Sequence, residues 1–376
     1  MTGSRPLGVW ALIVGGGTGG HVVPAIAIGQ ALVARGHPAD TIHFVGSARG
    51  IERRLVPAAG FTVTLLPGRG IARHLTPANL AAAVGLAVAV VKAVVLVGRL
   101  RPSVVVAVGG YASVAGALAA VVWRVPLVAA EQNAVPGLAN RLAGRFAAAA
   151  AVSFPGTALP RAVVTGNPVR PQILAVDRSP AGRGAARQAL GLPAEAFVVA
   201  VVGGSLGARR LNEATVGLAA QWAGRSGVAI RHVIGERDFD TMARLAPPPA
   251  AGGLIYQPVR FEDRMDLLLA AADLTVQRAG ASTVAELTVV GVPAILIPLP
   301  GAPGDHQGAN ARRLAAAGAA VVVPDHELDT DRLGREIDQL IGDPDRRRAM
   351  GEAARALARP DAAAAVAQLA EENARA

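Results

Sequence analysis

The sequence contains no cysteine, and aromatic residues make up only 3 % of its 376 residues. Without cysteine the protein can form no disulfide, has no thiolate nucleophile and cannot bind zinc through sulfur. So few aromatic side chains leave little surface on which nucleic-acid bases could stack, and we expect no nucleic-acid partner.

Lysine is almost absent as well, since Lys92 is the only one in the chain. The formal net charge of +10 at pH 7 is therefore carried almost entirely by arginine. A basic balance of this kind favours phosphates, anionic lipids or nucleic acid as partners. A general preference for arginine, with most guanidinium groups simply solvated, explains the same composition. Charge alone does not choose between the two.

The chain also lacks a long apolar run that is free of charge. The best candidate for a membrane span covers residues 80–98, and Lys92 lies within it. A lysine there would cost about 2.5–3.5 kcal/mol on insertion, and the surrounding Ala and Gly contribute little driving force. We therefore expect a helix buried on one side. Residues 1–8 do not resemble a secretory signal, so we expect the chain to stay in the cytoplasm.

The length of the chain exceeds what one ordinary core can organise, and apolar runs alternate with helical patterns in two series. The expected strands cover 9–14, 41–45, 61–66, 104–108, 127–130 and 148–152, then 197–202, 229–234, 254–256, 274–276, 294–297 and 320–323. Such continuous apolar strands are typical of doubly wound parallel sheets. We expect an α/β fold of two Rossmann-like domains, 1–168 and 169–359, facing across a cleft, with a helix at about 360–376 packing back on the first.

A glycine-rich turn follows the first strand, where residues 14–21 have the sequence VGGGTGGH. Glycine lets the backbone approach a ligand closely, and the N-terminus of the next helix adds unpaired N–H groups that favour an anion. Gly15, Gly17 and Gly20 match the dinucleotide fingerprint GxGxxG. A nicotinamide site also requires an acidic residue after the second strand, and Asp40 lies before that strand instead.

Polar side chains gather at other expected strand ends of the first half. His21 begins the first helix, where a histidine is a candidate general base or simply bonds a loop carbonyl, and both interpretations stay open. Residues 131–133 (EQN) and 109–111 (GGY) each follow a strand. Ligand sites in α/β domains lie at such ends.

The second half has its own glycine turn, GGSLG at 203–207, in which Ser205 can cap a helix or bond a phosphate. The segment RAGASTVAE at 278–286 opens a helix whose first amides can take an anion, while Glu286 can accept both hydroxyls of a ribose. A capping box is the alternative. The loop PLPGAPGDHQ at 298–307 ends in side chains that can bind sugar hydroxyls, although turn chemistry alone would also explain it.

Taken together and in this order, seven segments resemble the MurG family of peptidoglycan glycosyltransferases. They are GGGTGGHVVPAIAI, GGYAS, EQNAVPGLANR, TGNPVR, GGSLGAR, RAGASTVAEL and PLPGAPGDHQGANA. The resemblance implies a GT-B glycosyltransferase that moves GlcNAc from UDP-GlcNAc to the C4 hydroxyl of MurNAc in undecaprenyl-pyrophosphoryl-MurNAc-pentapeptide, converting lipid I to lipid II with inversion. The acceptor is expected on the N-terminal domain and the donor mainly on the C-terminal one.

The resemblance also implies roles for single residues, with His21 as the base and Tyr111 and Glu131 on the acceptor side. The donor is expected to contact Thr18, Gly19, Gly20, Asn133, Arg170, Ser205, Phe261, Glu262, Ala281, Ser282, Thr283, Val284, Ala285, Glu286 and Gln307. Within this set, the uracil lies by Phe261 and Glu262, and the ribose lies on Glu286. Glu262 departs from the apolar residue usual in the family, so its backbone is the part expected to meet uracil. No cofactor is implied, and a metal is not strictly required, because helix N-termini and Arg170 can stabilise the charge on UDP.

Because the implied acceptor is a lipid, the enzyme must work at a membrane surface without spanning it. We expect a peripheral site on the cytoplasmic face of the cell membrane, formed by an apolar patch ringed with bases. Its residues would be Leu75, Leu80, Val84, Leu86 and Val88 with Arg69, Arg73, Lys92, Arg99 and Arg101. The same helix could instead simply pack on the sheet.

Two further interpretations of the whole chain stay open at the level of sequence. One is a different UDP-sugar enzyme of the same fold, such as an epimerase or a glycolipid synthase. The second is a non-catalytic nucleotide- or lipid-binding module, which would keep the UDP pocket without needing His21 or Asn133.

Overall fold

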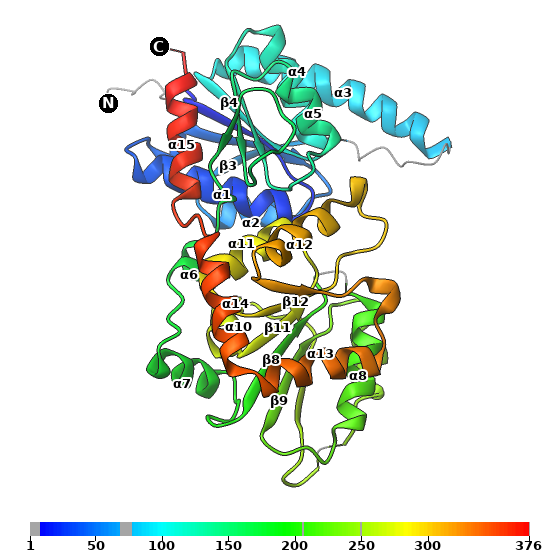
Figure 1. Cartoon of the computed structure of the whole chain (residues 1–376). Coiled ribbons are helices and arrows are strands. Elements are labelled where there is room, and N and C mark those ends of the chain that lie inside the picture. Colours follow the sequence, from blue (N-terminus) through cyan, green and yellow to red (C-terminus); the bar gives the residue numbers. More distant parts are fainter. Residues whose placement is uncertain (1–7, 68–76, 205–206, 249, 376) are drawn as a thin grey trace, which may run out of the picture. The chain divides into compact units, whose positions relative to one another are not determined.

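The computed structural model describes residues 8–67, 77–204, 207–248 and 250–375, with only the backbone described for 77–83. The chain divides into two units, one made of residues 1–170 with 359–376 and the other of residues 171–358 (Figure 1). Each unit contains one parallel sheet. The expected fold class, two doubly wound Rossmann-like domains of the GT-B type, is confirmed.

The sheet of the first unit has seven parallel strands. Their order is β3 (Thr62–Leu66), β2 (Ile42–Ser47), β1 (Ala11–Gly15), β4 (Val104–Gly109), β5 (Leu127–Glu131), β6 (Ala149–Val152) and β7 (Ala162–Val164). The chain runs outward from β1 to β3 and then returns to β4 on the other side of β1, so the strand order reverses between β1 and β4. Loops that follow strands at such a reversal are where α/β domains bind ligands.

Helices cover both faces of this sheet, which explains why its central strands are apolar throughout. The helices are α1 (Gly19–Ala34), α2 (Glu52–Ala58), α3 (Pro77–Leu100), α4 (Tyr111–Val122), α5 (Leu138–Gly144) and α15 (Ala362–Asn373), with a 3-10 turn η1 (Ala39–Thr41). One core lies between the sheet and α3, α4 and α5. The other lies between the sheet and α1, α2 and α15.

The terminal helix α15 is therefore part of the first unit, although it comes last in the chain (Figure 1). Its residues Val366 and Leu369 are buried in the core that α1 also contributes to. At the surface, Glu371 accepts hydrogen bonds from Arg35 and from His37 Nε2, the latter at 3.0 Å. The hydrogen bond from Arg35 lowers the pKa of Glu371. The contact is thus apolar in its centre and ionic at its edge.

The sheet of the second unit has six parallel strands and repeats the reversal. Their order is β10 (Ile255–Val259), β9 (Val228–Val233), β8 (Phe197–Val202), β11 (Leu274–Gln277), β12 (Ala294–Leu296) and β13 (Ala320–Val322). The order reverses between β8 and β11. The loops after these two strands are the ones that carry GGSLG and RAGASTVAE, so the second unit also places its candidate residues where a ligand is expected.

The first helix of the second unit, α6, follows directly after the last residue of the first unit. The helices of the second unit are α6 (Pro171–Leu174), α7 (Pro180–Ala189), α8 (Arg209–Gln221), α9 (Phe239–Arg244), α10 (Met265–Ala271), α11 (Ala281–Val290), α12 (His306–Ala316), α13 (Thr330–Gly342) and α14 (Pro344–Ala356), with turns η2 (Pro303–Asp305) and η3 (Asp325–Glu327). α8 and α13 pack against each other. Their residues Leu211 and Leu333 meet Val199 and Val276 of the sheet in one core.

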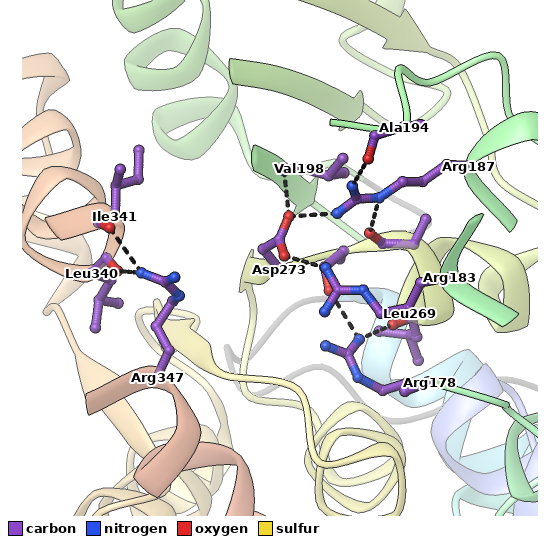
Figure 2. Close-up of polar contacts among 12 residues, drawn as sticks. Arg178, Arg183, Arg187, Ala194, Val198, Leu269, Asp273, Leu340, Ile341 and Arg347 are labelled. Atoms are coloured by element: carbon purple, nitrogen blue, oxygen red, sulfur yellow. Dashed lines mark hydrogen bonds and ion pairs between the residues drawn. The ribbon is translucent and has the colours of Figure 1, made fainter. Parts of the chain in front are cut away.

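Helix α7 is fastened to the amino end of this sheet by arginines that share one carboxylate (Figure 2). Asp273 accepts hydrogen bonds from Arg183, from Arg187 Nη2 at 2.7 Å and from the Val198 amide at 2.7 Å. Arg178 donates to the carbonyl oxygens of Leu269 and Ala272, which end α10. Burial, and then the charge of Arg183, lower the pKa of Arg178 to about 10.

Arg347 likewise caps the end of a helix. Its Nη1 donates to the carbonyl oxygens of Leu340 and Ile341 at the end of α13 (Figure 2). These carbonyls belong to the last helical turn and have no intrahelical donor. Its guanidinium also lies 4.8 Å from the centre of the Phe197 ring. Arginine thus supplies helix caps at the end of the sheet opposite the candidate loops.

The strand β7 is not among the strands expected from the sequence. It has only three residues, all exposed, and it pairs with β6 at the edge of the first sheet. Its lack of a buried run removes the signal that identified the other strands. The helix expected in place of a membrane span is α3, and no helix in the described ranges is long and apolar enough to cross a membrane.

Candidate functional site

The first glycine loop is shaped by close contact with the turn after β4. Gly15, Gly16 and Gly17 have φ values of 144°, 144° and 97°, which side-chain-bearing residues rarely adopt. The Gly16 amide donates to the Gly109 carbonyl oxygen at 3.2 Å. A Cβ atom on Gly110 would lie 2.2 Å from the Gly16 carbonyl oxygen. Glycine is therefore required at 15 and 110 for the two turns to touch, and the positive φ favours glycine at 16, 17 and 109.

His21 lies in the first turn of α1, beside this contact. Its Nδ1 is 3.2 Å from Thr18 Oγ1, and its ring lies over Gly109, where a Cβ would come within 2.9 Å of Nε2. The half-buried imidazole is thus held on one side by the threonine hydroxyl and on another by the glycine backbone. The ring is thus fixed at the carboxyl edge of the sheet, where α/β domains bind their ligands.

Glu131 organises the turn that carries Asn133. Its carboxylate is buried and accepts hydrogen bonds from the Asn133 amide at 2.9 Å, Asn133 Nδ2 at 3.1 Å, the Gly137 amide at 3.0 Å and Asn140 Nδ2 at 2.9 Å. Both carboxylate oxygens are therefore engaged within the protein. These hydrogen bonds orient Asn133, and the acceptor-side role expected for Glu131 stays a prediction.

Tyr111 is tied to the end of β3. Its hydroxyl donates to the Pro67 carbonyl oxygen at 2.9 Å, and burial raises the pKa of the phenol. Tyr111 therefore keeps its proton at neutral pH and joins the turn after β4 to the residue that follows β3. Sequence reasoning placed it on the acceptor side, and this hydrogen bond holds it at the same edge of the sheet as His21.

In the second unit, α12 fixes the peptide that precedes α11. Gln307 Oε1 accepts hydrogen bonds from the Ala279 amide at 3.2 Å and the Leu299 amide at 3.0 Å. Asn310 Nδ2 donates to the Ala279 carbonyl oxygen at 3.1 Å. Both the amide and the carbonyl oxygen of Ala279 are thus held by side chains of α12. The N-terminus of α11 therefore keeps one direction relative to the loop after β12.

The first turn of α11 contains the backbone amides for which the sequence predicts anion binding. The helix spans Ala281–Val290, and its N-cap is Gly280, with no side chain capping it. The alternative of a capping box is therefore wrong for this helix. The amides of residues 281–283 precede the first intrahelical hydrogen bond, which runs from Val284 to Gly280, so they remain open to an anion. Ala281 and Val284 are buried, and Ser282, Thr283, Ala285 and Glu286 are half-buried.

Arg278 is a structural residue that sequence reasoning did not assign. Its Nη1 donates to the carbonyl oxygens of Ile297 and Pro298, at 3.1 and 3.3 Å, and to Asp325 Oδ1 at 2.6 Å. Arg210 Nε lies 3.4 Å from the other oxygen of Asp325. A pocket of about 600 Å³ is lined by these three residues and by Arg209, Glu213, Ala214, Leu328, Asp329 and Thr330.

A buried polar chain supports the second glycine loop. His232 bonds the Tyr256 hydroxyl through Nδ1 at 2.8 Å and Asn212 Oδ1 through Nε2 at 3.0 Å. Asn212 in turn donates to Asp238, whose Oδ2 lies 2.9 Å from where a Cβ on Gly207 would be. Burial lowers the pKa of His232 to about 3, so the ring is neutral at physiological pH. Ser205 lies outside the described residues.

The structure explains why a glutamate stands at position 262, where an apolar residue is expected: the side chain forms a buried ion pair. Its carboxylate is buried and paired with Arg231, whose Nε and Nη2 lie 2.8 and 2.7 Å from Oε2. Oε1 accepts from the Arg264 amide at 3.1 Å. The side chain therefore points into the unit, while its neighbour Phe261 is 55 % exposed. A uracil near this loop would meet the Phe261 ring and the backbone.

The structure also gives the positions of Arg170 and of residues 18–20, which the sequence predicts to contact the donor. Arg170 is the last residue of the first unit and is half-buried, and Thr18, Gly19 and Gly20 begin α1 at the edge that also holds His21. Among the residues that the structure describes, no three His, Asp or Glu side chains are grouped so as to hold a metal ion.

Comparison with known proteins identifies the family. Residues 11–152 match the glycosyltransferase family 28 N-terminal domain, and residues 198–366 match the family 28 C-terminal domain. The crystal structure of MurG from Acinetobacter baumannii is similar over 96 % of this chain and 99 % of its own, with a TM-score of 0.75 and 29 % sequence identity. The chain is a member of the MurG family. Like other MurG-family proteins it is a glycosyltransferase, which excludes the nicotinamide-dependent oxidoreductase suggested by GxGxxG.

Curated relatives of this MurG-family chain match it over nearly its whole length. A protein of Alkalilimnicola ehrlichii is 44 % identical over 365 residues, covering 97 % of this chain and 99 % of its own. One of Desulforudis audaxviator is 40 % identical over 361 residues, covering 93 % and 95 %. Both are named UDP-N-acetylglucosamine–N-acetylmuramyl-(pentapeptide) pyrophosphoryl-undecaprenol N-acetylglucosamine transferase.

Proposed function

We propose that this chain transfers GlcNAc from UDP-GlcNAc to the C4 hydroxyl of MurNAc in undecaprenyl-pyrophosphoryl-MurNAc-pentapeptide, with inversion to a β-1,4 bond. The observation that carries the proposal is the near-complete similarity to transferases named for this donor and acceptor. The reaction places the protein in peptidoglycan synthesis, and hence in cell-wall formation, cell shape and cell division. Its acceptor-binding role falls to the first unit, and most of its donor-binding role falls to the second.

The second unit supplies what a nucleotide-sugar donor requires. Open amides at residues 281–283 face the diphosphate, and the Glu286 carboxylate can accept both ribose hydroxyls. As the bond to the sugar breaks, negative charge grows on UDP, and preorganised N–H groups stabilise it without reorganising. Ser205 and the side-chain amide nitrogen of Gln307 add contacts to phosphate and sugar, as does Arg170 at the end of the first unit, and Phe261 lies against the uracil.

The first unit supplies the base and the contacts to the reacting sugar. His21, held by Thr18, takes the proton of the MurNAc C4 hydroxyl as its oxygen attacks the anomeric carbon. Asn133, oriented by Glu131, binds the GlcNAc. The amides of Thr18, Gly19 and Gly20 lie next to the pyrophosphate groups.

The direct test uses the full chain with radiolabelled UDP-GlcNAc and a short-chain lipid I analogue. We expect label in the lipid product and stoichiometric release of UDP. UDP binding without transfer would support a non-catalytic module, and release of an epimerised sugar would support an epimerase. Either of these results overturns the proposal.

We also propose that the protein attaches peripherally to the cytoplasmic face of the cell membrane through α3 and its neighbours. Valines 84, 88, 91 and 95 of α3 are 58, 42, 63 and 54 % exposed and recur at helical spacing on one face. On α4, which packs next to α3, Val122 and the C-cap residue Trp123 are exposed apolar side chains as well. Lys92, Arg99 and Arg101 are exposed beside them. An apolar stripe edged with cations is suited to an anionic bilayer surface.

Some of the residues expected in this patch cannot be placed. Arg69, Arg73 and Leu75 lie outside the described residues, as does the side chain of Leu80. Leu86 is half-buried, whereas Val84 and Val88 are exposed as the proposal requires. Val91 and Val95, which the sequence did not single out, are exposed to a similar degree.

Substituting Val91→Asp and Val95→Asp together is expected to weaken binding to vesicles containing anionic lipid by about 100-fold, since burying each valine contributes about 1.5 kcal/mol. UDP affinity should not change. Cosedimentation with vesicles measures the first quantity and calorimetry the second. The matched control is Leu245→Asp, which alters an equally exposed apolar residue of the second unit. Unchanged vesicle binding by the double variant would exclude this surface.

A further inference from the structure

A buried carboxylate lies directly beneath the first glycine loop. Glu52, the first residue of α2, is only 2 % exposed, although its neighbours in the sequence, Ile51 and Arg53, are both exposed. Its Oε2 accepts a hydrogen bond from the Gly17 amide at 3.0 Å, and Oε1 lies 3.2 Å from the same amide. Oε1 also accepts from the Ser47 amide at 2.6 Å. Both oxygens thus act as acceptors for backbone N–H groups.

Three glycines make room for this carboxylate. A Cβ on Gly16 would lie 2.4 Å from Oε1, one on Gly46 would lie 2.3 Å from Cγ, and one on Gly50 would lie 2.0 Å from Oε2. These glycines come from the loop after β1, from β2 and from the turn before α2. Of the three, only Gly16 has a positive φ, so at Gly46 and Gly50 the reason for glycine is space for Glu52.

The contacts decide which amides of the loop are left for a ligand. The Gly16 amide donates to the Gly109 carbonyl oxygen, and the Gly17 amide donates to Glu52. The following amides, of residues 18–20, open α1 and precede its first hydrogen bonds, which His21 and Val22 donate to the Thr18 carbonyl oxygen. A second anion at residues 15–17 would also be repelled by the carboxylate already there.

We propose that Glu52 is a positioning residue for the transfer reaction. Its carboxylate holds the amide of Gly17, so that anionic substrate groups are met by the N–H groups of Thr18, Gly19 and Gly20 and not by the preceding glycines. The hydrogen bond between Glu52 and the Gly17 amide also sets the direction of α1. It therefore sets the position of His21, which follows Gly20 in the first turn of that helix. The contacts of Glu52 all lie within the first unit, and the expected effect on the reaction rests on the proposed function.

The test compares Glu52→Gln and Glu52→Ala with wild type, and uses Arg53→Ala, an exposed neighbour on the same helix, as control. We expect kcat of the Glu52 variants to fall by about 100-fold, the loss typical of a catalytic group misplaced by about 1 Å. KM for UDP-GlcNAc should change much less than kcat, because most of the residues proposed to bind the nucleotide belong to the second unit. Added formate should restore part of kcat in Glu52→Ala and none in the control.

A second route to the same defect is Gly46→Ala. Its methyl group would press on Glu52 Cγ without straining a backbone whose φ any residue can adopt. We expect Gly46→Ala to lower kcat as well, and the double variant with Glu52→Ala to be no worse than Glu52→Ala alone, because both act through one contact. Additive losses in the double variant would contradict the proposal.

Amide hydrogen exchange gives a readout that needs no activity. The Gly17 amide should exchange faster in both Glu52 variants than in wild type and in Arg53→Ala. Unchanged exchange, or a wild-type kcat in both Glu52 variants, overturns the inference. So does a loss of kcat accompanied by an equal loss of UDP binding and of thermal stability. If wild type itself transfers no GlcNAc, the proposed function fails, and the exchange experiment still decides the role of Glu52.

Discussion

Replacing Asp273 with alanine is expected to lower the free energy of unfolding of the second unit by about 3–5 kcal/mol, the usual result of removing one member of a buried ion pair. Its side chain is 17 % exposed and is shared by Arg183 and Arg187. Without it, Arg183 and the Val198 amide lose their acceptor, Arg187 keeps only its bonds to the carbonyl oxygens of Ala194 and Ala271, and Arg178 is left among like charges. The pKa of Arg178, already lowered by burial and by Arg183, would fall further.

Urea unfolding followed by the fluorescence of Trp222 measures this loss, in a background where Trp10 and Trp123 are replaced by phenylalanine so that only the second unit reports. The control is Asp345→Ala, which removes an 84 % exposed carboxylate from its pair with Arg348. An exposed pair of this kind contributes at most about 1 kcal/mol. If the two variants unfold alike, the arginine cluster of Figure 2 is not what fastens α7 to the sheet.

Replacing His21 with alanine is expected to lower kcat by about 10²–10⁴-fold, the range that a positioned general base contributes. UDP affinity should stay about the same, since the His21 side chain is not among the groups proposed to bind the nucleotide. The pH dependence gives the sharper readout. Activity of wild type should fall on the acid side as His21 becomes protonated, and that limb should be missing from the residual activity of the variant.

Thr18→Val separates the orientation of the imidazole from its chemistry. It removes the hydroxyl 3.2 Å from Nδ1 and leaves the ring in place, so we expect a smaller loss of kcat than in His21→Ala, with the acid limb retained. Full turnover by His21→Ala with an unchanged pH profile would assign the base to another residue. Initial rates with the lipid I analogue at saturating donor measure both effects.

The strands and the glycine turns could be predicted because their signals are local. A strand buried on both faces, such as β4, must be apolar along its whole length, and the runs at 104–108 and 197–202 show this directly. The edge strand β7 has no buried run and therefore gives no such signal. A glycine turn between a strand and a helix is equally visible, but which of its amides remain available is not.

The supporting residues could not be predicted because their partners are distant in the chain. Glu52 bonds Gly17 across 35 positions, Arg231 bonds Glu262 across 31, and Arg278 bonds Asp325 across 47. Each is a charged residue in a segment that otherwise suggests a solvated face or a strand. A polar residue inside the β9 run, such as Arg231, is the one local hint, since a central strand buries charge only beside a partner.

The return of α15 to the first unit has a consequence for the order in which the protein forms during synthesis. The face of the first sheet that receives Val366 and Leu369 is complete only after α15 has been translated. At about 5–20 residues per second, the ribosome needs roughly 10 to 40 s to make the intervening second unit. For that time the nascent first unit carries an uncovered apolar strip, so the second unit can finish folding before the first, although it is made later.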